Sequence, residues 1–192
     1  LVCDMSSDIF SRKINITDFD LIYAGAQKNM GPAGTTLYIF KKEILGKSSV
    51  PIPTMLDLKT HADKDSMFNT PPVFPIYASM LTLRWLKNNG GIENIELQNQ
   101  NKADLIYNEI DRNSLFSGTA KREDRSNMNA TFALNDENDK DVFDKMLVDA
   151  NISGLKGHRS VGGYRASMYN ALPTESVQVL VDVMKDLENK KV

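Results

Sequence analysis

The sequence predicts an α/β protein built in two parts. Short β-prone runs separated by small residues occupy the first forty positions, whereas runs with helical spacing dominate after position 76. The segment Asn88-Asn89-Gly90-Gly91 interrupts two helical patterns and is the expected boundary between the parts. We therefore expect residues 1–88 to belong to one domain and residues 89–192 to form a small second α/β domain.

Composition excludes several classes of function. The chain has 192 residues and a formal net charge of −2, so no general attraction to nucleic acid or to an anionic membrane is expected. Its apolar runs are shorter than the roughly 18 residues that a membrane helix needs. Cys3 is the single cysteine and cannot form an intrachain disulfide, which favours a reduced, cytoplasmic setting.

The first residues indicate that the chain begins inside a larger protein. Residue 1 is Leu rather than Met, and LVCDM is typical of a strand already in progress. No charged segment precedes an apolar one, so we do not interpret the start as a signal peptide.

Three short strands are expected in the first part. Residues 1–3 have the composition of the end of a buried strand, with Asp4 at its carboxyl tip. Residues 21–24 and 35–40 are further β-prone runs on either side of a Gly-Pro-Ala-Gly turn. Residues 47–73 contain four prolines and sustain no period, so we expect an irregular segment.

Helices are expected to dominate the rest of the chain. Met80, Leu81, Trp85 and Leu86 recur at helical spacing, which predicts that they are core residues of a helix. The remaining expected elements are helices at 76–87, 92–110, 138–150 and 174–190, strands at 128–134 and 166–169, and an extended segment at 152–155.

Lys28 is the first residue that suggests chemistry. It lies in GAQKNMGPAG, where a β-prone run enters a glycine-rich turn that lets backbone approach a ligand closely. A lysine partly withdrawn from water in such a place is a nucleophile suited to Schiff-base formation. An ordinary surface lysine beside a turn is the alternative interpretation.

Asp4 is the second candidate, because the carboxyl tips of buried strands are where α/β folds place ligand contacts. A turn or helix-capping residue is its alternative. Together, Lys28 and Asp4 match the needs of pyridoxal phosphate, whose aldehyde is held by a lysine and whose pyridine nitrogen is kept protonated by an acidic residue.

Two loops complete the set of candidates. The segment GHRSVGGYR places His158, Arg159 and Arg165 among three glycines, which favours a site for carboxylate or phosphate over a solvated basic loop. The segment SMFNTPP offers Asn69 and Thr70 as neutral donors to a phosphate or simply as parts of a stiff turn. We expect no metal site, because His61 stands beside acidic residues without a second histidine.

These motifs, in this order, resemble the phosphoserine aminotransferase family, pyridoxal-phosphate enzymes of the aspartate-aminotransferase fold type. The similarity runs over the whole chain. It includes DMSSDIFSR, IYAGAQKNMGPAG, SMFNTPP, KNNGG and LKGHRSVGGYRASMYNA. The resemblance implies that the chain corresponds to about the C-terminal half of the family's length. Residues 1–88 would then be the end of the large cofactor-binding domain, of fold type I, and residues 89–192 most of the small domain.

The resemblance also implies a cofactor site. Lys28 would hold the aldehyde of pyridoxal phosphate covalently and act as the catalytic base, and Asp4 would pair with the pyridine nitrogen. Gln27 would contact the cofactor phosphate. Asn69 and Thr70 would reach that phosphate in the neighbouring subunit of a homodimer.

Substrate contacts follow from the same resemblance. Arg165 would bind the substrate α-carboxylate, and His158 with Arg159 would bind the second anion. The implied reaction moves an amino group from glutamate to 3-phosphohydroxypyruvate, giving 2-oxoglutarate and phosphoserine for serine biosynthesis. Because the family's other half supplies part of the site, we expect this chain alone to be inactive or nearly so. A non-catalytic, self-associating fragment and a related transaminase for another anionic keto acid are the alternatives.

Overall fold

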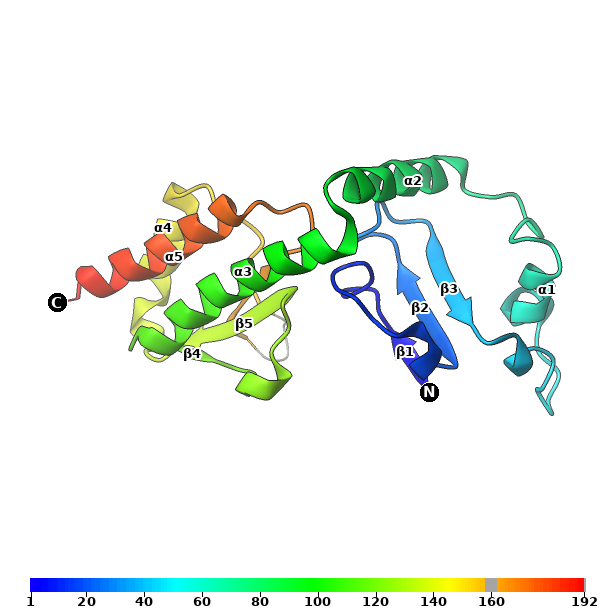
Figure 1. Cartoon of the computed structure of the whole chain (residues 1–192). Helices are drawn as coiled ribbons and strands as arrows, with labels where there is room; N and C mark the ends of the chain where they lie inside the picture. Colours follow the sequence, from blue (N-terminus) through cyan, green and yellow to red (C-terminus); the bar gives the residue numbers. More distant parts are fainter. Residues whose placement is uncertain (158–161, 192) are drawn as a thin grey trace. The chain divides into compact units, whose positions relative to one another are not determined.

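The computed structural model describes residues 1–157 and 162–191 of the chain (Figure 1). It consists of two compact units, Leu1–Ile92 and Glu93–Val192. The division predicted after residue 88 lies a few residues before the division between these units. Both units are α/β, which confirms the predicted fold class.

The first unit contains a three-stranded sheet in the order β1-β2-β3 (Figure 1). Its strands are β1 (Val2–Asp4), β2 (Leu21–Gly25) and β3 (Thr36–Phe40). β1 runs parallel to β2 with Asp4 opposite Tyr23, and β3 runs antiparallel to β2. Because β1 and β2 are parallel, their carboxyl ends lie at the same edge of the sheet.

The core of the first unit is formed by β2 and the two segments that follow β1 and β2. Its buried members are Met5, Ile9, Ile22, Ala24, Ala26 and Met30. The prediction that residues 1–3 end a buried strand is wrong for this structure, because Val2 is 64% exposed. Among the described residues, β1 lies at the edge of the sheet and pairs only with β2, so its side chains are not fully covered. Its apolar composition therefore predicted a strand correctly but did not predict its exposure.

The helices of the first unit follow the sheet. The segment predicted to be irregular contains the 3₁₀ turn Thr54–Leu56 and the short helix α1 (Leu58–Ala62), and it is followed by α2 (Val73–Asn88). The helical prediction for residues 76–87 is therefore confirmed. The core prediction is only partly right, since Leu86 is buried but Leu81 and Trp85 are exposed.

The described residues of the second unit form three helices, the first of which begins just before the unit, and a second three-stranded sheet in the order β4-β5-β6. Its main elements are α3 (Gly91–Arg112), β4 (Phe116–Gly118), β5 (Asn129–Leu134), α4 (Lys140–Asp149), β6 (Tyr164–Ser167) and α5 (Thr174–Asn189). In the described part of the chain, the remaining 3₁₀ turns are Ile16–Asp18, Lys42–Ile44, Arg122–Asp124 and Glu137–Asp139.

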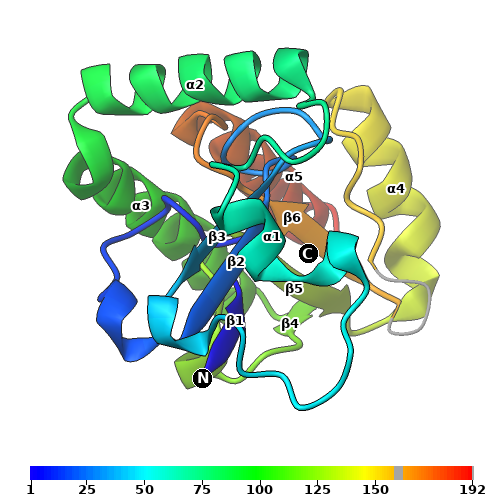
Figure 2. The same cartoon turned by 90° about the vertical axis from the view of Figure 1, so that its right-hand side faces the viewer.

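One face of the second sheet is buried beneath the helices (Figure 2). Residues of β5 alternate strictly between partly exposed and buried, which is the pattern of a strand with one covered face. Phe132 of β5, Phe143 of α4 and Tyr164 of β6 pack ring against ring at the centre of this core. Residues from α3 and α5 complete the same hydrophobic cluster.

One strand of this sheet is absent from the sequence prediction. Strand β4 lies between the helix expected to end at residue 110 and the strand expected to begin at residue 128, where no element was predicted. A three-residue strand is too short to show a period. Residues 152–155 form no strand of their own. They nevertheless lie beside β6, since the Arg165 N–H donates to the Leu155 carbonyl over 2.7 Å. Among the described residues, no helix has the length and apolar character needed to cross a membrane.

The aromatic centre of the second unit yields a stability prediction. Phe143→Ala should lower the free energy of unfolding by about 3–5 kcal/mol, because it opens a cavity among fully buried rings. Val148→Ala on the same helix is the matched control and should have little effect, since Val148 is 70% exposed. Urea unfolding followed by circular dichroism measures both. Equal losses in the two variants would contradict the packing described here.

Candidate functional site

Asp4 ends β1 at the sheet edge that β2 also reaches. The Ser6 N–H donates to Asp4 Oδ1 over 2.8 Å, and the Gly25 N–H donates to the Ser6 hydroxyl over 3.0 Å. Ser6 therefore connects the tip of β1 to the last residue of β2. Sequence reasoning missed Ser6, although a serine two residues after an aspartate is a recognisable turn signal.

The carboxylate of Asp4 is held in its ionised form. Hydrogen bonds from the Ser6 side chain and backbone lower the pKa of Asp4, and smaller contributions come from the Tyr23 hydroxyl and the positive charge of Lys28. In return, the charge on Asp4 raises the pKa of Tyr23. The structure thus brings Asp4 and Lys28 within electrostatic range of each other, although 23 residues separate them in the sequence.

A tight turn after β2 presents Lys28. The Ala26 carbonyl accepts from the Met30 and Gly31 N–H groups over 3.1 and 2.8 Å, and the Ala26 N–H donates to the Thr35 carbonyl. Asn29 is buried and its side-chain amide donates to the carbonyls of Ser7 and Ile9. The turn is therefore anchored on one side by Asn29 and Met30 and projects Gln27 and Lys28 from the other.

Close packing explains one glycine of this turn. A Cβ atom on Gly31 would lie 2.9 Å from Ser79 Oγ and 3.1 Å from Ser79 Cα, both in α2. Gly31 therefore allows this turn to pack closely against α2. The expectation that Lys28 itself is partly withdrawn from water is wrong for this structure, because its side chain is exposed. The turn is crowded at Gly31, and it buries Asn29 and Met30, the two residues that follow the lysine.

Asn69 and Thr70 lie apart from this pair. Both are exposed, and the Asn69 side-chain amide donates to the Thr70 carbonyl over 3.3 Å. Asn69 lines a cavity of about 440 Å³ with residues of β3, α1 and the start of α2. Neither Asp4 nor Lys28 lines that cavity, so the first unit does not bring all its predicted cofactor residues together.

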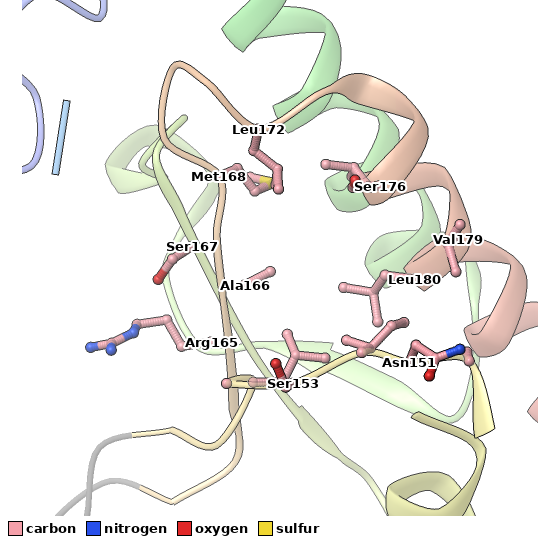
Figure 3. A pocket seen from close by; sticks show the side chains of 15 residues that line it. Asn151, Ser153, Arg165, Ala166, Ser167, Met168, Leu172, Ser176, Val179 and Leu180 are labelled. Atoms are coloured by element: carbon pink, nitrogen blue, oxygen red, sulfur yellow. The ribbon is translucent and has the colours of Figure 1, made fainter. Parts of the chain in front are cut away.

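Arg165 lies in the second unit, on β6 opposite Thr131 of β5. Its side chain is exposed. Its backbone borders a largely apolar cavity of about 380 Å³, but its guanidinium points away from the Leu172, Ser176 and Leu180 side chains (Figure 3). The cavity is therefore not a binding site that Arg165 serves.

His158 and Arg159 lie outside the described residues, but the ends of their loop are described. The Gly157 N–H donates to the Gly163 carbonyl over 2.9 Å, and Lys156 bridges to Tyr164. Gly163 has φ 62°, and a Cβ atom there would lie 2.6 Å from the Phe132 carbonyl oxygen. A side chain at position 163 would therefore clash with the backbone of β5, so this position requires glycine.

Comparison with known proteins identifies the family. The model for class-V aminotransferases matches residues 1–180. The chain belongs to the class-V aminotransferase family.

Its relatives are similar over the full length of the chain. The phosphoserine aminotransferase of Flavobacterium psychrophilum is 72% identical over 99% of the chain. A structure of the phosphoserine aminotransferase from Bacillus circulans subsp. alkalophilus has a TM-score of 0.94 and 43% identity over 100% of the chain. A pyridoxal-phosphate-bound phosphoserine aminotransferase from Trichomonas vaginalis has a TM-score of 0.89 and 37% identity over 96% of the chain.

The chain spans about half the length of these relatives, with 53% of each covered. This share does not say which half is matched, so the placement in the C-terminal half stays a prediction.

The first unit of this class-V aminotransferase chain fits part of a pyridoxal phosphate site. Asp4 is a carboxylate with a lowered pKa, as a partner of a protonated pyridine nitrogen must be. Lys28 is an exposed primary amine within electrostatic range of it, accessible to an aldehyde. Among the described residues, no group of three or more His, Cys, Asp or Glu side chains is placed to hold a metal ion.

The Asp4 network predicts a pH response. Asp4 should titrate below 3.8 in the wild type, and Ser6→Ala should raise its pKa because the largest stabilising hydrogen bonds involve Ser6. Lys28→Met should raise it less, since the Lys28 charge is the smallest contribution. Carbon-13 NMR titration of the Asp4 carboxyl group measures these shifts.

Ser48→Ala, an exposed serine of the same unit, is the control and should leave the Asp4 titration unchanged. Because the folded-state pKa lies below the unfolded one, Asp4 contributes stability above pH 3.8 that is lost as the pH falls through the folded pKa. An Asp4 pKa that does not respond to Ser6→Ala would refute the network.

Proposed function

We propose that this chain is part of a phosphoserine aminotransferase that transfers the amino group of glutamate to 3-phosphohydroxypyruvate. The observation that carries the proposal is the parallel pairing of β1 with β2, which puts Asp4 and the turn that carries Lys28 at the same edge of the first sheet. The positive charge of Lys28 contributes there to the lowered pKa of Asp4. Membership of the class-V family and 72% identity to a phosphoserine aminotransferase support it. The pathway served would be serine biosynthesis.

Pyridoxal phosphate is the proposed cofactor, and it supplies an electron sink for the bond changes at the substrate Cα. The Lys28 amine would bind the cofactor aldehyde and, once displaced by the substrate amine, move the proton at Cα. Asp4 would hold the proton on the pyridine nitrogen, which its lowered pKa favours. Gln27, which the turn projects beside Lys28, would contact the cofactor phosphate.

A homodimer would complete the phosphate contacts. Asn69 and Thr70 are exposed, and the cavity that Asn69 lines does not include Lys28, which supports a role toward the phosphate bound by the neighbouring subunit. Neutral amide and hydroxyl donors suit this role, because they add hydrogen bonds without adding charge.

Substrate recognition is proposed for the second unit. Arg165 has an exposed guanidinium on a strand that is paired on both sides, which suits a rigid, two-pronged contact with the substrate α-carboxylate. His158 and Arg159 would bind the second anion, the phosphate of one substrate or the side-chain carboxylate of the other. A transaminase for uncharged side chains would not need that second anion site.

A non-catalytic role is the second candidate for the 192-residue chain by itself. The exposure of Lys28 and the coverage of only 53% of the relatives' length favour it. We therefore assign the activity to the protein extended to the length of those relatives, and expect the chain alone to be inactive or nearly so.

The proposed role of Lys28 predicts a single labelled lysine. The extended protein, treated with pyridoxal phosphate and then borohydride, should carry one stoichiometric adduct at Lys28, mapped by peptide mass spectrometry. Lys28→Ala should abolish this adduct. It should also lower kcat by on the order of 10²–10⁴-fold, the typical contribution of a positioned proton shuttle. Lys47→Ala, an exposed lysine of the same unit, is the matched control. An adduct that survives Lys28→Ala would sink the assignment.

The proposed role of Arg165 predicts a binding defect. Arg165→Ala in the extended protein should raise KM for both substrates on the order of 10²-fold, because both carry the α-carboxylate and lose charge-assisted hydrogen bonds. Arg122→Ala is the control, since Arg122 is a surface arginine of the same unit that pairs with Asp111. Steady-state kinetics with each substrate varied in turn measure the effect. An unchanged KM for both substrates would exclude Arg165 as their carboxylate ligand.

A further inference from the structure

Lys102 is a buried lysine that the proposed reaction does not use. It lies on α3 and its side chain is only 1% exposed. Lysine is almost never fully buried unless its ammonium group is paired, because removing that charge from water is costly. A lysine in this position therefore needs a structural or functional reason.

The reason lies in the segment that joins β6 to α5. Lys102 Nζ donates to the carbonyl oxygens of Met168, Tyr169 and Leu172 over 3.1, 3.0 and 3.1 Å. An ammonium group has three N–H donors, so these three carbonyls match its full hydrogen-bonding capacity. Burial lowers the pKa of Lys102 to about 8, which still leaves the ammonium form in excess at neutral pH.

A second side chain on the same face of α3 holds the same segment. Asn99 lies one helical turn before Lys102, and its amide donates to Asn170 Oδ1 over 2.9 Å. Both asparagines are buried. Two polar side chains of α3 thus bind residues 168–172.

The segment held in this way continues directly from the strand that carries Arg165. The Met168 N–H donates to the Met128 carbonyl over 2.7 Å, so Met168 is bound on its amide side to the chain before β5 and on its carbonyl side to Lys102. The end of β6 is therefore fixed three residues after Arg165. Displacement of this end would move the strand that orients the guanidinium.

We infer that Lys102 is a positioning residue for substrate binding: its ammonium group holds the carbonyls that follow β6 and thereby sets the position of Arg165. This inference rests on the proposed role of Arg165. Lys102 acts through the backbone and does not touch the substrate. Its effect should therefore appear in the binding of the carboxylate and not in the proton transfer.

Amide hydrogen exchange in the 192-residue chain tests whether Lys102 holds the end of β6, without any activity assay. Lys102→Met keeps the side-chain length but removes the donors, and should speed exchange of the Arg165 and Met168 amides on the order of tenfold. Lys185→Met, an exposed lysine on α5, is the matched control and should leave both amides unchanged. Unchanged exchange at both amides in Lys102→Met would overturn the inference.

Kinetics of the extended protein separate positioning from a merely structural role. Lys102→Met should raise KM for glutamate and for 3-phosphohydroxypyruvate on the order of tenfold, with kcat per folded active site changed by less than about threefold. A lowered melting temperature with unchanged KM would overturn the inference. If Lys102→Met does not fold, Asn99→Ala removes the neighbouring contact and should raise both KM values in the same direction by a smaller factor, and unchanged values would again overturn it.

The two proposals fail in different ways. Absence of aminotransferase activity in the wild-type extended protein would contradict the proposed function, while hydrogen exchange would still decide whether Lys102 holds the end of β6. Normal wild-type activity with an unchanged KM in the variants would contradict the positioning role alone.

Discussion

The parallel pairing of β1 with β2 is the constraint on which the candidate cofactor site depends. It places the carboxyl tip of β1, where Asp4 lies, beside the end of β2 and the turn that presents Lys28. Ser6 strengthens this relation, because its hydroxyl accepts from Gly25 while its backbone N–H binds the Asp4 carboxylate. An antiparallel pairing of the same strands would have put the acid and the amine at opposite ends of the sheet.

In the second unit, apolar packing fixes the orientation of the strands. Its centre is a cluster of aromatic rings between the sheet and its helices, and that cluster determines which face of β5 and β6 is buried. Alternation along β6 then turns Arg165 to the exposed face, between the buried Tyr164 and Ala166. Apolar packing thus decides the direction in which Arg165 points, and Lys102 binds the carbonyls of the segment that follows the strand.

Residue-level reasoning predicted candidate residues for the site but not their environment. Lys28 is a candidate because a lysine beside a glycine-rich turn is unusual. In the structure this turn is crowded where Gly31 approaches α2. The same reasoning placed the lysine itself in that crowding, whereas the turn buries Asn29 and Met30 and exposes Lys28. Roles for Gln27, Asn69 and Arg165 came from the family resemblance, because spacing alone does not identify the ligand of a neutral amide or a guanidinium.

The sequence by itself determined the class of fold, the longer helices, the central strands and the break near Gly90, because these depend on local periodicity and on glycine. Tertiary structure decided burial. Trp85 and Leu81 have helical spacing, yet they are exposed because periodicity tells which side chains share a face and not whether another element covers it. Tertiary structure alone also revealed Lys102, since a lysine in a polar stretch of helix gives no local sign that three carbonyls from residues 168–172 will surround it.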